Sequence, residues 1–338
     1  MADIARRAVI ASAVGVLSVA AVVAAATRSG GGDAPGAGVA STDTWLPLSS
    51  SPLTRTEVAA ARIGRHIYVV GGFAASSGET TSAVARYDIA QDAWTQVSSM
   101  PIGVNHPTAT SYRGKLYVHG GFTDPGSLGG ATDRLHRYNP DRNRWKRLPD
   151  ADIPRAAHAL GAIDGKLYAA GGANSSSGEL TSLEIYDISD RKWKSGPEMS
   201  VGRNHVAGAV VQRHLYVIGG RPDSLDVVER YDPKRREWRT VAPLNTSRSG
   251  FTAAVVRGKI VAFGGEELAP GGATIEQVEL YDPGADDWTG LPDMLTPRHG
   301  LGGAAKERRV FALEGGPQPG GSFSKVLEFL DIRKSLAP

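Results

Sequence analysis

The sequence has no cysteine among its 338 residues. This absence excludes disulfide bonds, cysteine-ligated zinc, iron–sulfur clusters and a thiol nucleophile. Charge of one sign is also scarce, since 38 Lys and Arg residues against 35 Asp and Glu residues leave a net charge of +3. So small an excess gives no argument for a nucleic-acid partner, and we expect none. The chain also has no G-x-S-x-G elbow, H-E-x-x-H pair or P-loop, so it predicts no catalytic residues and no cofactor.

The N-terminal segment contains the one long apolar run. Residues 8–26 carry no charge, and 19 residues of helix span about 28 Å, close to the ~30 Å hydrocarbon thickness of a membrane. Arg6 and Arg7 precede the run and favour a cytoplasmic N-terminus. A cleaved signal peptide fits through its Ala24-Ala25-Ala26 site, and an uncleaved anchor helix fits the full length.

These features predict a signal peptide or signal-anchor helix over residues 1–27 and a flexible Gly/Ser/Ala linker over residues 28–43. We therefore expect an exported protein, either anchored to the outer side of the cytoplasmic membrane or secreted. We expect the rest of the chain, residues 44–338, to form the folded domain.

Internal repetition dominates that domain. Tryptophans recur at intervals of 45 to 51 residues: Trp45, Trp94, Trp145, Trp193, Trp238 and Trp288. A tyrosine stands seven residues before each of the last five: Tyr87, Tyr138, Tyr186, Tyr231 and Tyr281. Glycine doublets recur in step: Gly71-Gly72, Gly120-Gly121, Gly171-Gly172, Gly219-Gly220, Gly264-Gly265 and Gly315-Gly316.

Each repeat is typical of four short strands. A small apolar strand is followed by a tight turn, a second strand that ends at the glycine doublet, a third with the tyrosine and a fourth with the tryptophan. The shared spacing of Gly-Gly, Tyr and Trp resembles the kelch repeat. That resemblance implies an all-β fold, a six-bladed β-propeller with four-stranded blades; its one departure is Leu330 in place of the sixth tyrosine.

The order of the signatures predicts how the ring closes. Trp45 precedes every doublet, and Gly315-Gly316 is followed by no tryptophan. We therefore expect the segment 44–48 to pair with the C-terminal blade as its outer strand, which removes a free sheet edge.

Longer and more variable loops predict the binding face, at the connections between strands 2 and 3 and between successive blades. Polar side chains at the start of the innermost strands lie on this face: Arg55, Asn105, Arg155, Arg203, Asn204, Arg248 and Arg298. Arginines at a channel mouth suit carboxylate or phosphate groups, although they can also brace neighbouring blades. The resemblance to cytoskeletal and ubiquitin-ligase adaptor kelch proteins implies that this face binds acidic peptides. We expect a protein, peptide or glycan ligand.

Histidines also lie at these strand starts, at positions 106, 158, 205 and 299. They come from different repeats and no carboxylate pattern accompanies them, so we expect no metal site.

Other interpretations stay open. The resemblance extends to six-bladed sialate mutarotases, which implies an exported carbohydrate-acting enzyme with Glu266 or Glu267 as acid/base, unless these are solvated loop carboxylates. A structural cell-envelope component is a further alternative. The turns of the opposite face are rich in Lys and Arg, which suits either simple solvation or contact with an anionic membrane surface.

Overall fold

The computed structural model describes residues 43–174 and 178–336. The predicted signal or anchor helix, and the linker up to residue 42, lie outside these residues. Among the described residues, no helix has the length and apolarity needed to cross a membrane. The helical element that is described is a short 3-10 turn, η1 (Pro140–Arg142), so the expectation of an all-β domain is confirmed.

The described strands form six four-stranded antiparallel sheets, numbered I to VI here. Sheet I contains β3 (Ala59–Ile63), β4 (His66–Val70), β7 (Val84–Asp88) and β8 (Ala93–Val97). Sheet II contains β9 (Thr108–Tyr112), β10 (Lys115–His119), β11 (Leu135–Asn139) and β12 (Arg144–Arg147). Sheet III contains β13 (Ala159–Ile163), β14 (Lys166–Ala170), β17 (Leu183–Asp187) and β18 (Lys192–Ser195).

The second half of the chain repeats this plan. Sheet IV contains β19 (Ala207–Val211), β20 (His214–Gly220), β21 (Leu225–Asp232) and β22 (Glu237–Val241). Sheet V contains β23 (Thr252–Val256), β24 (Lys259–Phe263), β25 (Val278–Asp282) and β26 (Asp287–Leu291). Sheet VI contains β27 (Gly302–Lys306), β28 (Arg309–Leu313), β29 (Leu327–Asp331) and, from the other end of the domain, β1 (Thr44–Pro47).

Short strands in the loops form two further ladders. One joins β2 (Arg55–Thr56), β5 (Phe73–Ala74) and β6 (Glu79–Thr80). The other joins β15 (Ala173–Asn174) and β16 (Gly178–Glu179). The pairs β5–β6 and β15–β16 lie in loops that follow a glycine doublet, whereas β2 lies in the connection that precedes β3.

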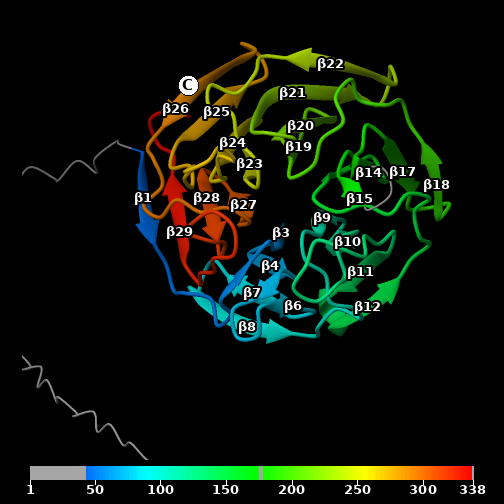
Figure 1. Cartoon of the computed structure of the whole chain (residues 1–338), viewed down its shortest axis with the longest axis horizontal. Coiled ribbons are helices and arrows are strands. Elements are labelled where there is room, and N and C mark those ends of the chain that lie inside the picture. Colours follow the sequence, from blue (N-terminus) through cyan, green and yellow to red (C-terminus); the bar gives the residue numbers. More distant parts are fainter. Residues whose placement is uncertain (1–42, 175–177, 337–338) are drawn as a thin grey trace, which may run out of the picture. The chain divides into compact units, whose positions relative to one another are not determined.

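The first strands of the six sheets surround a common centre (Figure 1). Each contacts the first strand of the next sheet, in the order β3, β9, β13, β19, β23 and β27, and β27 contacts β3 again. The outermost strands carry the repeat tryptophans at the rim, so each sheet runs outward from the centre.

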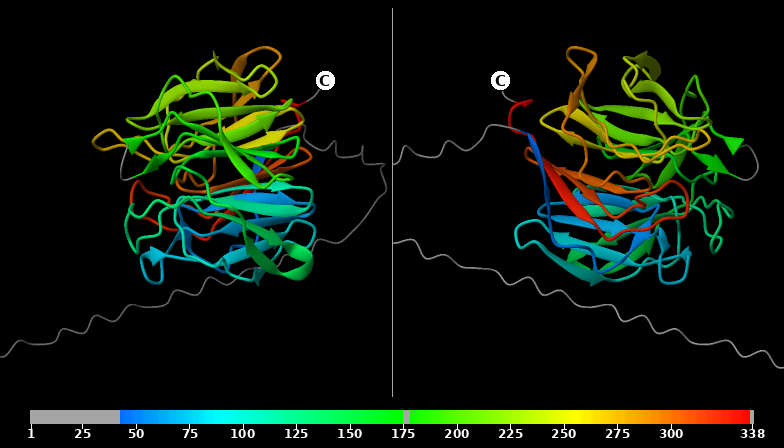
Figure 2. Two further views of the ribbon diagram at one scale, coloured as in Figure 1. Left: turned by 90° about the vertical axis from the view of Figure 1, so that its right-hand side faces the viewer. Right: turned by 60° about the vertical axis from the view of Figure 1, so that its left-hand side comes forward.

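The pairing of β1 with β29 joins segments from the two ends of the domain. Figure 2 shows β1 in blue beside β29 in red. Trp45 lies opposite Leu330, as Trp94 lies opposite Tyr87 in sheet I. The leucine therefore occupies the place that the repeat gives to tyrosine.

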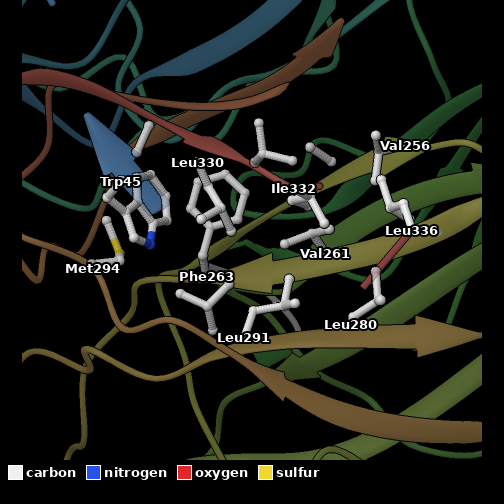
Figure 3. Packing of buried hydrophobic residues seen from close by; sticks show 14 of the residues in the cluster. Trp45, Val256, Val261, Phe263, Leu280, Leu291, Met294, Leu330, Ile332 and Leu336 are labelled. Carbon is white, nitrogen blue, oxygen red and sulfur yellow. The ribbon is translucent and has the colours of Figure 1, made fainter. Parts of the chain in front are cut away.

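Each tryptophan also connects its own sheet to the preceding one. The indole nitrogen donates a hydrogen bond of 2.7–3.0 Å to a backbone carbonyl that follows the outer strand of that sheet. The pairs are Trp45–Pro292, Trp94–Ser49, Trp145–Ser98, Trp193–Pro149, Trp238–Pro197 and Trp288–Ala242. Trp45 is 5% exposed and packs with Met294 and Phe263 between sheets V and VI (Figure 3). These contacts bury large aromatic surfaces without leaving the indole donor unpaired.

The glycine doublets permit close approach of neighbouring backbones. Both residues of a doublet have positive φ, and a Cβ on Gly71 would lie 2.4 Å from the carbonyl oxygen of Val104. In sheet VI the equivalent pair is Glu314 (φ +56°) and Gly315 (φ +91°), one residue earlier than the predicted Gly315-Gly316. A side chain therefore occupies the first doublet position in this sheet alone among the six described ones.

Candidate functional site

The five predicted arginines are buried, with relative exposures of 0–1%. Each forms an ion pair with a buried glutamate at an N–O distance of 2.6–2.9 Å. The pairs are Arg55–Glu314, Arg155–Glu184, Arg203–Glu229, Arg248–Glu279 and Arg298–Glu328. In each case Nη1 also donates to the backbone carbonyl 16 residues later, where the second strand ends.

Arg203 illustrates how the two terminal nitrogens of these guanidinium groups are used. It donates to the carbonyl oxygens of Gly219, Val227 and Val217 and to the carboxylate of Glu229. Glu229 in turn accepts from the backbone and hydroxyl of Ser200, in the connection that enters the sheet. Burial lowers the pKa of Arg203, and the negative charge of Glu229 opposes that effect.

Sheets I and II show that the charges come as pairs. In sheet II, Val104 occupies the arginine position and His136 the glutamate position, so both charges are missing together. In sheet I, Ala85 occupies the glutamate position, and Glu314 reaches across from sheet VI to bind Arg55. A buried charge without its partner is strongly destabilising, which explains this matching. These contacts favour the bracing role, and none of the five arginines lines the two cavities described below.

The two predicted asparagines have a different place. Asn105 Oδ1 lies 2.7 Å from Nδ1 of His106, and Asn204 Oδ1 contacts Nδ1 of His205 in the same way. Each asparagine therefore orients the histidine that follows it in the chain.

A ring of six equivalent residues surrounds the central axis at the start of the first strands. All have left-handed backbone conformations: Glu57, His106, Ala157, His205, Gly250 and Gly300, with φ between +50° and +63°. Backbone hydrogen bonds link several neighbours, for example from His106 to Glu57 and from Gly300 to Gly250. This conformation is uncommon for residues other than glycine, and three of the six carry long polar side chains.

Those three side chains converge. Nε2 of His106 lies 3.0 Å from Oε2 of Glu57, and the rings of His106 and His205 are 4.7 Å apart between centroids. One potential ligand atom from each of the three lies within 4.8 Å of the others. Burial would raise the pKa of Glu57. His106, His299 and His205 outweigh burial and hold the pKa of Glu57 well below the usual range. Burial lowers the pKa of His205, with further contributions from His106 and Arg221.

A second polar group lies beside this cluster. Nε2 of His299 is 3.8 Å from Glu57 and 3.9 Å from Glu266, and it contacts the carbonyl oxygen of Gly320 at 2.8 Å. Glu266 is 4% exposed and binds Arg221 at 2.7 Å, so it is no solvated loop carboxylate. Glu267, its neighbour, is exposed.

Two cavities meet at the ring of six residues. A cavity of about 310 Å³ opens on the loop side, with a polar floor of Glu57, His106, His205, Glu266 and His299. Phe73, Leu128 and Phe323 add apolar walls from three different loops. A channel of about 490 Å³ continues along the first strands on the other side, lined mainly by small residues.

Sequence reasoning missed Glu57 and the meeting of histidines from separate repeats. The premise that histidines of different repeats stay apart, with no carboxylate nearby, is wrong for His106 and His205. Aligning the repeats would have supplied a signal, because Glu57, His106 and His205 stand at one repeat position where the other sheets have alanine or glycine. His158 lies elsewhere, against His119 and Thr108.

Ion pairs neutralise part of the opposite, basic face. Basic residues at the turns between the first two strands form ion pairs with aspartates at or just after the end of the third strand. The pairs are Arg65–Asp88, Lys115–Asp141, Lys166–Asp187, Lys259–Asp282 and Arg308–Asp331. These pairs weaken the argument for contact with an anionic membrane.

Comparison with known families agrees with the repeat pattern. The family described as KLHDC2/KLHL20/DRC7 Kelch-repeats domain matches residues 41–220, more than half of the chain. The chain belongs to the kelch-repeat family. A second description, Kelch motif, matches residues 202–245 and 247–295, so kelch repeats extend through sheets IV and V.

Known kelch proteins match about half of the chain. Kelch-like protein 15 of Danio rerio is 31% identical over 195 residues, which are 53% of this chain and 32% of that protein. Kelch-like protein terF of Aspergillus terreus is 27% identical over 188 residues, 52% of this chain and 41% of that protein. The matched region thus spans about a third of the length of such relatives.

A solved structure, titled "Structure of YjhT", has the same fold with a TM-score of 0.69. It covers 83% of this chain and 95% of its own, at 18% identity. At that identity the likeness concerns the fold alone.

Proposed function

We propose that this kelch protein is a binding module that captures a protein or peptide segment at the loop-side cavity. The observation that carries the proposal is the cavity itself, which combines half-buried to exposed apolar walls with mostly buried polar and charged groups at one end of the ring. Such a combination suits a ligand with an apolar side chain beside a polar or charged group. Kelch repeats are generally protein-binding, which supports the same proposal.

Leu128 offers a test because it lines the cavity and is 51% exposed. Leu128→Asp should abolish capture of ligand from a peptide array while the melting temperature changes little. Leu46→Asp is the matched control, since Leu46 is 43% exposed on β1 and does not line the cavity. Equal ligand capture by both variants would contradict the proposal.

We also infer that the six sheets are the blades of one closed propeller. The cyclic contacts of the first strands, the pairing of β1 with β29 and the circle of tryptophan hydrogen bonds support this inference. Closure makes the ring rigid, and a rigid ring presents the loops of all six sheets to one ligand.

Export remains part of the proposal and rests on the apolar run of residues 8–26. A fusion of the chain to a reporter that is active only outside the cytoplasm should be active. An inactive reporter on a stable fusion would remove this part and leave the binding proposal intact.

A carbohydrate-acting enzyme is the second candidate, and one observation favours it. Glu57 and Glu266, both facing the cavity, flank His299 at 3.8 and 3.9 Å, so two carboxylates and an imidazole could share proton transfer on a small sugar. NMR measurement of anomeric exchange in reducing sugars, sialic acids included, tests it. Acceleration that is lost in Glu266→Gln would support the enzyme.

A further inference from the structure

We propose that Glu57, His106 and His205 form a binding site for one divalent transition-metal ion, with zinc as the ion that suits it best. This metal site goes beyond the binding function proposed above, because binding of the ion does not depend on which protein or peptide the cavity captures. It lies where the loop-side cavity meets the central channel, and sheets I, II and IV each contribute one residue through the start of their first strand.

The donor set matches the chemistry of such ions. Two imidazole nitrogens and one carboxylate oxygen bind zinc and iron(II) in many proteins, whereas calcium and magnesium prefer oxygen ligands alone. The three ligand atoms lie within 4.8 Å of one another, and Glu57 and His106 are already 3.0 Å apart. Zinc bonds of about 2.0–2.2 Å need donor atoms roughly 3.3–3.5 Å apart, so small side-chain rotations complete the site.

The asparagines supply the outer contacts that metal-binding histidines usually have. The orientation of the Asn105 amide is determined by its NH₂ group, which donates to the carbonyl oxygen of Ser127. Its Oδ1 must then accept from Nδ1 of His106. Asn204 repeats this arrangement, with its NH₂ on Glu179 and its Oδ1 at Nδ1 of His205.

Protonation of Nδ1 leaves the lone pair of each neutral ring on Nε2. In His106 that lone pair faces the carboxylate of Glu57, so two acceptors stand 3.0 Å apart. Within residues 43–174 and 178–336, Nε2 of His205 has no hydrogen-bond partner. Between His106 and Glu57 a cation resolves the arrangement: either a metal ion, which the ring of His205 also stands close enough to bind, or a single proton shared by His106 and Glu57.

Comparison of the repeats shows that the backbone of the ring does not require the side chains of Glu57, His106 and His205. The equivalent positions in the other sheets carry Ala157, Gly250 and Gly300. Glycine adopts the left-handed conformation more easily than other residues, and alanine places only a methyl group near the axis. Three protein ligands with a cavity on one side also leave a coordination position open, as in metal sites that bind a further ligand. A carboxylate or hydroxyl of the captured molecule could reach it from the cavity.

Isothermal titration of the full-length, EDTA-treated protein with Zn²⁺ tests the proposal. We expect one ion per chain. Asn105→Ala and Asn204→Ala each remove an outer contact and should weaken the affinity for Zn²⁺ by roughly 10–100-fold. His106→Asn and His205→Asn each remove a ligand and should weaken the affinity by at least as much. His214→Asn is the matched control, since His214 is partly exposed on β20 outside the site and should leave the affinity unchanged.

A second measurement does not depend on how the variants fold. Co²⁺ added to the wild-type protein should give the intense visible absorption of a low-coordinate N/O site, and Zn²⁺ should remove it. Weak octahedral absorption, or Zn²⁺ affinity that is equal in the wild type and in folded His106→Asn and His205→Asn variants, would overturn the metal site and leave the shared proton.

Discussion

Removal of one member of a buried ion pair should separate bracing arginines from ligand-binding ones. Arg203 and Glu229 are 0% and 1% exposed, and Arg203 also satisfies three backbone carbonyls. Arg203→Met leaves Glu229 charged and buried without its main partner, which typically destabilises a protein by about 3–5 kcal/mol. Glu229→Met should destabilise it by a similar amount, because the guanidinium group then remains unpaired and Ser200 loses its acceptor.

The double variant gives the sharper number. If the two residues act as a pair, Arg203→Met/Glu229→Met should lose well under the roughly 6–10 kcal/mol sum of the single losses. It should still lose about 1–3 kcal/mol, since the carbonyls and the Ser200 turn stay unsatisfied. Urea unfolding at equilibrium measures all three, with an unchanged m-value as the check that the folded and unfolded states remain comparable.

Arg239→Met is the matched control, because Arg239 pairs with Glu237 on an exposed part of β22. An exposed pair of this kind contributes about 0–1 kcal/mol. The bracing role is refuted if Arg203→Met unfolds at the same urea concentration as this control, or if it loses ligand capture at full stability.

Two further predictions concern closure and acid. Trp45→Ala should destabilise the domain by roughly 3–5 kcal/mol through the cavity it leaves, whereas Leu46→Ala on the same strand should change stability little; equal effects in thermal unfolding would speak against closure by β1. Burial, together with the positive charges of Arg134 and Arg147, lowers the pKa of His136 from 6.5 to about 4. Between these pH values His136 is protonated in the unfolded chain and neutral in the native protein. Stability therefore falls as the pH falls through this window, and His136→Gln should lose less of it than the wild type; identical urea midpoints for both from pH 7 to pH 4 would show that His136 contributes nothing.

Much of the fold was predictable because the repeat is local. Spacings such as the seven residues from Tyr231 to Trp238 reflect one hairpin, and the structure pairs these two residues directly. The kelch resemblance and the all-β class are confirmed on this basis. The sixth doublet was misplaced by one residue, because Glu314 adopts a left-handed conformation that sequence patterns assign to glycine.

The site was less predictable because its partners lie in different repeats. The positions of the arginines at the strand starts were evident, but their pairing was not. Four of the five bind a glutamate two residues before the repeat tyrosine or its substitute Leu330, as Glu229 stands before Tyr231, and Arg55 binds Glu314 of another sheet. That regularity is visible in the sequence once the pairing is known. Nothing local indicates that Glu57 and His205, 148 residues apart, face each other.

The sequence alone determined the repeating unit, since strand alternation, tight turns and the Tyr–Trp hairpin depend on neighbours within some fifty residues. Tertiary structure decided which side chains meet at the axis. Contacts there arise where six strand starts converge, and the geometry of that convergence comes from the packing of whole sheets rather than from any one segment.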